Sequence, residues 1–144
     1  CGGKVVVADW RGDWIGVGIA QLLALEGRHV RLLTSGPAPG VSLPAHVRDH
    51  IVGQLTRLNV EITPNARLFG VDEDTAYFQQ TMTGDAIVVE DAETVVLALG
   101  HRAKDGLFNA LEDLNVALYG IGDALSPRTA EEAVLEGLKV GAAL

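Results

Sequence analysis

The sequence predicts an α/β domain built on a parallel sheet, with an antiparallel β-meander inserted into it. Two apolar runs rich in β-branched residues, starting at Val5 and Thr94, have the composition of strands buried on both faces of a parallel sheet. From the strand at Val5 to the strand over residues 60–62, segments of strand and helical character alternate in the order βαβαβ. Residues 66–89 then lose the helical period and show short strand segments separated by turn residues.

The first βα unit is a strand followed by a short polar turn and a helix. The strand is VVVA after Lys4, and Asp13 is placed to cap the helix that follows the turn. Gly27 is placed to end that helix. The apolar residues at helical spacing are Ile15, Ile19, Leu22 and Leu23.

The second unit repeats this order. A strand is predicted over His29 to Thr34, and the sequence SGPAPG after it is typical of a loop. Ser42 is placed to cap a helix, and Asn59 can take the left-handed exit before a strand over residues 60–62. The apolar stripe of this helix is Val47, Ile51, Leu55 and Leu58.

The three strands of the meander are predicted at residues 66–71, 75–82 and 86–90, separated by DED and TGD turns. The aromatic residues there are expected to pack between strands or in the core. They are Phe69, Tyr77 and Phe78.

The remaining segments return to the α/β pattern. A buried strand is predicted over 94–99 and ends at Gly100, a short helix over 107–114, and a last strand over 116–121. Thr129 and Glu132 fit a capping box at the start of a helix that runs to the end of the chain. We expect residues 1–144 to form a single domain.

Composition narrows the classes of function. The 144 residues carry 11 Lys and Arg against 19 Asp and Glu, and 48% of them are hydrophobic, which suits one globular domain. Without a basic cluster, binding to nucleic acid or a membrane surface is not expected. The lone Cys1 cannot form an intrachain disulfide, no zinc-ligand spacing is present, and a cytoplasmic location is expected. A first residue other than Met suggests a piece of a longer polypeptide.

The negative charge is concentrated in one region. Of the net charge of −8, nearly all falls between Glu61 and Glu93, where eight acids accompany one base, Arg67. This distribution indicates a solvated face on the meander and its flanks, and says little about a ligand site.

The turn after the first strand has the frame of a dinucleotide site. In such sites glycines let backbone N–H groups reach a pyrophosphate at a helix N-terminus, and Gly12 and Gly16 are placed to do so. Asp9, however, stands where the first glycine of GxGxxG belongs, and Asp13 adds a second carboxylate that would repel a phosphate. Arg11 is the local cation. We interpret the site as degenerate and keep a working NAD(P) site as an alternative.

Other features of this region also differ from a dinucleotide site. Trp10 and Trp14 are bulky where the backbone should be open. The second strand ends in Thr34, where a carboxylate would be needed to bind a ribose hydroxyl.

Four stretches carry a family resemblance that extends over nearly the whole chain. They are VVVADWRGDWIGVGIAQLLALEGRHVRLLT, LNVEI, TVVLALGHR and YGIGDALSPRTAEEAVLEG, the last being similar to a GDCxAPR…AVxEG segment. Together they resemble the C-terminal part of the trimethylamine dehydrogenase and 2,4-dienoyl-CoA reductase group. These enzymes are related to the old yellow enzymes and to NADH:flavin oxidoreductases.

The resemblance implies an architecture and cofactors. Family members join an FMN-holding β/α barrel, with a [4Fe-4S] cluster, to two glutathione-reductase-like folds of three layers, one inserted in the other. Residues 4–100 would correspond to the inserted NAD(P)-type unit, and residues 116–144 to a returning strand and helix of the FAD- or ADP-binding unit. The partner would be the remainder of the polypeptide, with a homodimer left open.

The resemblance also implies site residues. Asp123, after Gly122, would accept hydrogen bonds from hydroxyls of an ADP or FAD moiety, and Arg128 could approach a phosphate. Gly100 begins a GHR step similar to the family's GRxP. No catalytic or metal-binding residue is expected in this chain, because hydride or electron transfer would occur at the FMN. No cofactor is expected in this domain itself, and ADP, FAD or NAD(P) is left open. A working NAD(P)H module and a ligand-free structural domain are the alternatives.

Overall fold

The computed structural model describes residues 3–144, so Cys1 lies outside the described residues. The chain divides into two compact units, one ending at Gly100 and the other running His101–Leu144. None of the described helices is long and apolar enough to cross a lipid bilayer.

A four-stranded parallel sheet is the middle layer of the first unit, with the strand order β3-β2-β1-β7. Val6 of β1 lies opposite Arg31 on one side and Val95 on the other, which fixes the register of the central strands. The strands are β1 (Lys4–Asp9), β2 (His29–Thr34), β3 (Glu61–Thr63) and β7 (Thr94–Ala98). All residues of β1 after Lys4 are buried, as the apolar run predicted.

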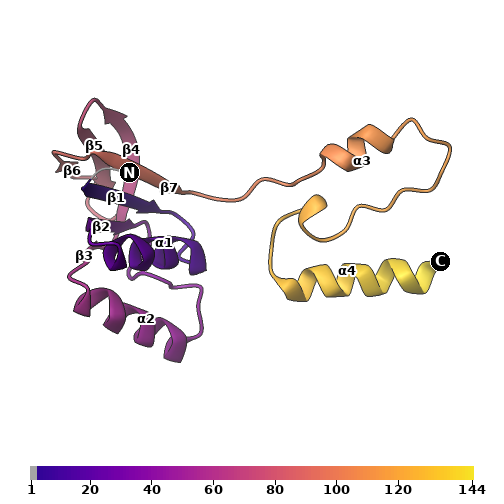
Figure 1. Cartoon of the computed structure of the whole chain (residues 1–144), viewed down its shortest axis with the longest axis horizontal. Helices are drawn as coiled ribbons and strands as arrows, with labels where there is room; N and C mark the ends of the chain where they lie inside the picture. The colour runs from indigo at the N-terminus through magenta and orange to yellow at the C-terminus, as the bar shows by residue number, and fades with distance from the viewer. Residues whose placement is uncertain (1–2) are drawn as a thin grey trace. The chain divides into compact units, whose positions relative to one another are not determined.

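Helices α1 (Trp14–Leu25) and α2 (Ala45–Arg57) cover one face of this sheet (Figure 1). Their apolar sides pack on alternate strand residues such as Val5 and Val7. Gly27 has φ +79° just beyond α1, and Asn59 has φ +56° just beyond α2, as the sequence predicted.

The predicted cap of α2 is wrong. The helix begins at Ala45 with Pro44 at its N-cap, and Ser42 lies two residues before Pro44, where its hydroxyl donates a hydrogen bond to the carbonyl of Arg11. Pro44 has φ −54° and ψ 138°, so it is extended and stands just before the helix, where its missing N–H needs no acceptor. Ser42 is thereby left to bond with the turn after β1.

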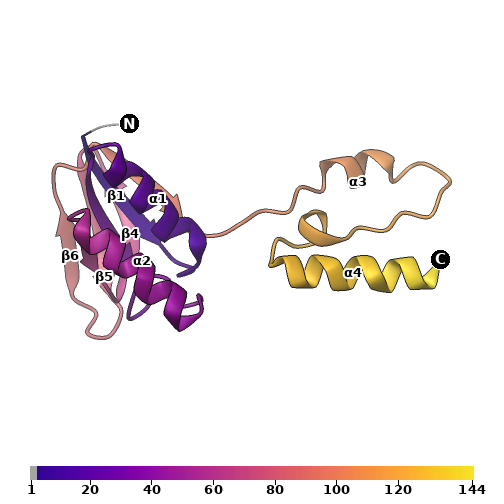
Figure 2. The ribbon, with the colours of Figure 1, turned by 60° about the horizontal axis from the view of Figure 1, so that its bottom comes forward.

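The antiparallel meander covers the opposite face of the sheet (Figure 2). Its strands are β4 (Ala66–Asp72), β5 (Thr75–Gln80) and β6 (Ala86–Val89). Phe78 lies in the core between meander and sheet, as predicted, whereas Phe69 is 85% exposed. The prediction for Phe69 is wrong because β4 alternates regularly there: Ala66 and Leu68 face the core, and Phe69 falls with Arg67 on the outward side.

The second unit contains α3 (Gly106–Leu111), a 3₁₀ turn (Gly122–Ala124) and α4 (Ala130–Ala143). The capping box of Thr129 and Glu132 is present at the start of α4, as predicted. The predicted strand over 116–121 is wrong, because this segment has no strand structure. A strand requires a neighbour to complete its hydrogen bonds, and the described residues of this unit contain no strand to pair with it. That residues 1–144 form a single domain stays a prediction.

Candidate functional site

The turn between β1 and α1 is closed around the side chain of Asp9. Asp9 ends β1 and is 3% exposed. Its Oδ1 accepts hydrogen bonds from the backbone N–H groups of Arg11 (3.1 Å) and Gly12 (3.0 Å). In a dinucleotide site the N–H groups of this turn would face the pyrophosphate. Here the protein's own carboxylate binds two of them.

Gly16 makes room for this carboxylate. A Cβ built at Gly16 would lie 2.4 Å from Cγ of Asp9, so any side chain there would collide with it. Oδ2 of Asp9 is buried and finds no hydrogen-bond partner among the described residues. Burial raises the pKa of Asp9, the hydrogen bonds from Gly12 and Arg11 lower it in part, and the charge of Asp13 raises it further.

The loop between β2 and α2 lies over the same turn. Ser35 and Ser42 each donate two hydrogen bonds, of 2.8–3.0 Å, to carbonyl groups of the turn. Gly12 has φ +62°, and a Cβ on it would lie 2.7 Å from Cγ2 of Val41. The glycine therefore permits a tight turn packed against the protein's own loop.

The charges at the start of α1 are also used within the chain. Asp13 caps the helix by accepting a hydrogen bond from the N–H of Ile15 (3.0 Å). Its other carboxylate oxygen lies 2.7 Å from Nε of Arg11. The local cation that could have approached a phosphate is thus paired with a carboxylate.

The end of β2 lacks a group for a ribose. Thr34 is buried, and its hydroxyl donates to the carbonyl of Gly36 at 3.0 Å. Arg31, inside the strand, lies 3.3 Å from Glu61 of the neighbouring β3. The donors and shape of this region therefore do not fit an NAD(P) dinucleotide.

A second glycine turn precedes α4. Gly122 has φ +59°, and its N–H donates to Oε2 of Glu136 at 2.7 Å. Asp123 follows it with an exposed side chain, while its carbonyl accepts a hydrogen bond from the N–H of Lys104 (3.2 Å). An exposed carboxylate on a fixed turn can accept hydrogen bonds from ligand hydroxyls. In this respect the second turn differs from the first, whose carboxylate is buried.

Arg128 is tied to the same glutamate. Its guanidinium forms an ion pair with Glu136, whose side chain is 16% exposed, so the cation is partly neutralised. Glu136 therefore bonds both Gly122 and Arg128. Sequence reasoning missed this role, since Glu136 differs from the other acids of α4 only in the direction its helical position faces.

The six predicted cofactor residues fall into separate groups. Gly12 and Gly16 surround Asp9 in the first unit. Three residues implied by the family resemblance lie in the second unit: Gly122, Asp123 and Arg128. Gly100 is the last residue of the first unit, and a Cβ there would meet nothing within 4 Å.

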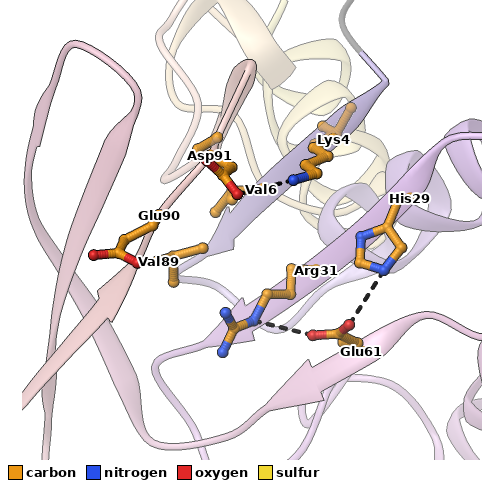
Figure 3. Close-up of a pocket in the computed structure, with 10 residues that line it drawn as sticks. Lys4, Val6, His29, Arg31, Glu61, Val89, Glu90 and Asp91 are labelled. Atoms are coloured by element: carbon orange, nitrogen blue, oxygen red, sulfur yellow. Dashed lines mark hydrogen bonds and ion pairs between the residues drawn. The ribbon is translucent and has the colours of Figure 1, made fainter.

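A pocket of about 150 Å³ lies at the opposite edge of the sheet, where β1, β2 and β3 begin (Figure 3). Its charged side chains pair with one another: Lys4 lies 2.9 Å from Asp91, and Glu61 lies 3.3 Å from both His29 and Arg31. Such exposed pairs link strand ends and contribute little stability. These pairings leave the pocket without the concentrated single charge that would select an ionic ligand.

No protein-family model and no curated protein matches the sequence. Solved structures do match. Over 96% of this chain, histamine dehydrogenase from Rhizobium sp. 4-9 is similar with a TM-score of 0.85 and 24% identity. The 6-hydroxypseudooxynicotine amine oxidase from Pseudomonas geniculata N1 is similar over 96% with a TM-score of 0.87 and 22% identity. A 2-naphthoyl-CoA reductase is similar over 97% with a TM-score of 0.81 and 27% identity.

These matches confirm the resemblance as one of structure and confirm the glutathione-reductase-type α/β fold. The chain spans 22%, 22% and 21% of the three matched chains, so it corresponds to about a fifth of each. It has the nucleotide-binding-like fold found within these larger enzymes.

Proposed function

We propose that this chain is the nucleotide-binding-like domain of an oxidoreductase of the amine dehydrogenase or NADH:flavin oxidoreductase type, with a first turn that takes no nicotinamide dinucleotide. The observation that carries the proposal is the carboxylate of Asp9, which binds the N–H groups of Arg11 and Gly12. The fold shared with amine-oxidising and acyl-CoA-reducing enzymes supports the class of parent protein.

In the complete enzyme the catalytic residues would lie outside these 144 residues. An FMN in a β/α barrel would supply hydride or single-electron transfer, and a [4Fe-4S] cluster would supply electron transfer. The role of this domain would be to pack against the remainder of its polypeptide and to hold a nucleotide of the ADP or FAD type. We place the enzyme in the cytoplasm and keep a homodimer as an open assembly.

The nucleotide contact would be made by the second glycine turn. Glu136 fixes the backbone of Gly122, so the carboxylate of the next residue, Asp123, stays in a defined position. There it would accept hydrogen bonds from the two hydroxyls of a ribose. Arg128 would reach a phosphate only by leaving its ion pair with Glu136.

Calorimetric titration of the 144-residue chain with NADH, NADPH, ADP and FAD tests the proposal. We expect no binding of NADH or NADPH, and ADP binding that Asp123→Ala weakens and the control Asp113→Ala does not. Micromolar binding of NADH or NADPH would show that the first turn is a working dinucleotide site, the main alternative.

The first turn can be tested by the variant Asp9→Gly, which removes the carboxylate and restores the usual glycine. If the carboxylate is what closes the site, the variant gains affinity for NADH or NADPH, and Asp13→Lys adds to the gain by removing a negative charge. No gain in affinity from Asp9→Gly, alone or combined with Asp13→Lys, would contradict the role given to these carboxylates.

A second candidate function is a purely structural domain. One observation favours it: Glu136 already binds the N–H of Gly122 and the guanidinium of Arg128, so two of the three polar groups of the second turn are used within the chain. Flat titrations for all four nucleotides would support this candidate and contradict the nucleotide role of Asp123.

A further inference from the structure

The meander has an apolar outer face as well as an apolar inner one. Its inner residues, such as Phe78, pack on the parallel sheet. An antiparallel sheet with one face on the core normally presents polar residues on the other. Here the outer face instead carries a group that we call the outer patch: Phe69, Tyr77, Ala86 and Val88.

The outer patch is open to solvent. Phe69 is 85% exposed, Val88 49% and Tyr77 39%. The strand register places Tyr77 opposite Val88, so their side chains share one face. Phe69, Tyr77 and Ala86 also line a shallow hollow of about 390 Å³. A large aromatic side chain exposed beside a hollow is typical of a binding surface, because burying it would be favourable.

Acidic residues surround the outer patch. Asp72 ends β4, Glu73 and Asp74 form the turn to β5, and Asp85 and Glu90 flank the ends of β6. The one base of this region, Arg67, has its guanidinium 4.5 Å from the ring centre of Trp10 and lines a hollow beside Phe69. Five acids thus stand against this one base. The frame of the patch is therefore negative.

We propose that the outer patch is a docking surface for a separate protein that presents apolar side chains framed by Lys and Arg. The apolar centre supplies the area to be buried, and the acidic frame selects a basic rim and raises the rate of encounter. A second copy of this chain is the wrong occupant, because face-to-face pairing would set acidic frames against each other. Docking on this face does not require a nucleotide bound by the domain.

The probe is an amphipathic helical peptide with Leu on one face and Lys on the other, compared with a peptide that carries Glu in place of Lys. Chemical shifts of the 144-residue chain report where each peptide binds. We expect the Lys peptide to shift the signals of Tyr77 and Val88 and the Glu peptide to shift neither. Raising the salt concentration should weaken the Lys peptide's binding at least several-fold, because the acidic frame contributes to it.

Matched variants locate the site. Phe69→Ser should weaken binding of the Lys peptide about tenfold or more, as truncation of a central aromatic anchor does. Leu22→Ser, at an exposed position of α1, should leave it unchanged. Val88→Thr keeps a residue that favours strands and should also weaken binding of the Lys peptide. This second variant tests the patch even if Phe69→Ser misfolds.

Three results would overturn the proposal. They are equal binding of the Lys and Glu peptides, equal loss with Phe69→Ser and Leu22→Ser, and a dimer in sedimentation experiments that Phe69→Ser abolishes. The last would identify a second copy of this chain as the occupant.

Discussion

The two glycine turns of this protein place a carboxylate differently. In the first, Asp9 is buried and accepts hydrogen bonds from its own turn, with Gly16 providing the space. In the second, Asp123 is exposed, and the turn is held by Glu136, fourteen residues later in the chain. Both turns have a glycine with positive φ, Gly12 and Gly122.

The difference shows that a glycine of positive φ near an aspartate does not by itself decide where the carboxylate lies. A carboxylate that binds its own turn occupies the place of a ligand phosphate. A carboxylate whose turn is held by another residue is left exposed to a ligand. Which of the two occurs depends on what surrounds the turn, and the following variants alter those surroundings.

The largest effect is expected from Gly16→Ala. Its Cβ would lie 2.4 Å from Cγ of Asp9, so the free energy of unfolding should fall by about 2–3 kcal/mol, as in an overpacked core. Gly18→Ala, in the same helix with nothing within 4 Å, should instead raise it by up to about 1 kcal/mol. Urea unfolding measures both.

A rescue experiment identifies the cause of the loss. In the background of Asp9→Gly the atoms that would meet the new Cβ are absent, so Gly16→Ala should cost little. An equally large loss in both backgrounds would contradict the contact with Asp9 as the reason for the glycine.

The next effect is on pH dependence. Because burial raises the pKa of Asp9, the folded state binds more protons than the unfolded state between the ordinary and the raised pKa. The free energy of unfolding should therefore fall as pH rises through this interval, by about 1.4 kcal/mol for each tenfold difference in proton affinity between the folded and unfolded states. Asp9→Asn should abolish the fall.

Urea unfolding from acid to neutral pH measures this prediction. The control Asp72→Asn changes an exposed carboxylate and should keep the slope of the wild type. An unaltered slope in Asp9→Asn would contradict the assignment to Asp9.

The second turn should respond to Glu136→Ala. The N–H of Gly122 loses its acceptor and Arg128 loses its ion pair, so the turn should open more readily by about 1 kcal/mol. Hydrogen exchange at the amide of Gly122 should accelerate about fivefold as a result. Glu131→Ala on the same helix is the control, and equal acceleration in both would show that helix stability, not the bond to Gly122, is responsible.

The smallest effect is expected from Arg67→Gln. The guanidinium lies 4.5 Å from the centre of the Trp10 ring, and such a contact contributes about 0.5–1 kcal/mol. The fluorescence of Trp10 and urea unfolding report the loss. Arg67→Lys keeps a cation and should lose less, and an equal loss in both would indicate that stacking of the planar group matters more than charge.

Most of the fold followed from the sequence. The pattern placed β2 at its observed bounds, the capping residues of α1 and α4, the turn residues Gly27 and Asn59, and the three strands of the meander. These features depend on local periodicity and on residues whose backbone preferences are strong, so neighbouring residues were enough to predict them.

The errors occurred where distant residues decide. Ser42 bonds with Arg11 instead of capping α2, Phe69 lies on the outward-facing set of β4 residues, and residues 116–121 have no neighbouring strand among the described residues of their unit. Each depends on a partner far along the chain or on a register that periodicity does not encode.

The candidate site divides in the same way. The order of residues is enough to establish that Asp9 stands where a dinucleotide site needs a glycine and that Asp13 adds a second carboxylate at the helix N-terminus. The folded chain was needed to learn that Asp9 points inward against Gly16, that the loop containing Val41 lies over the turn, and that Glu136 holds Gly122. Residue type sets which charge is present, whereas burial and hydrogen-bond partners set whether that charge faces the protein or a ligand.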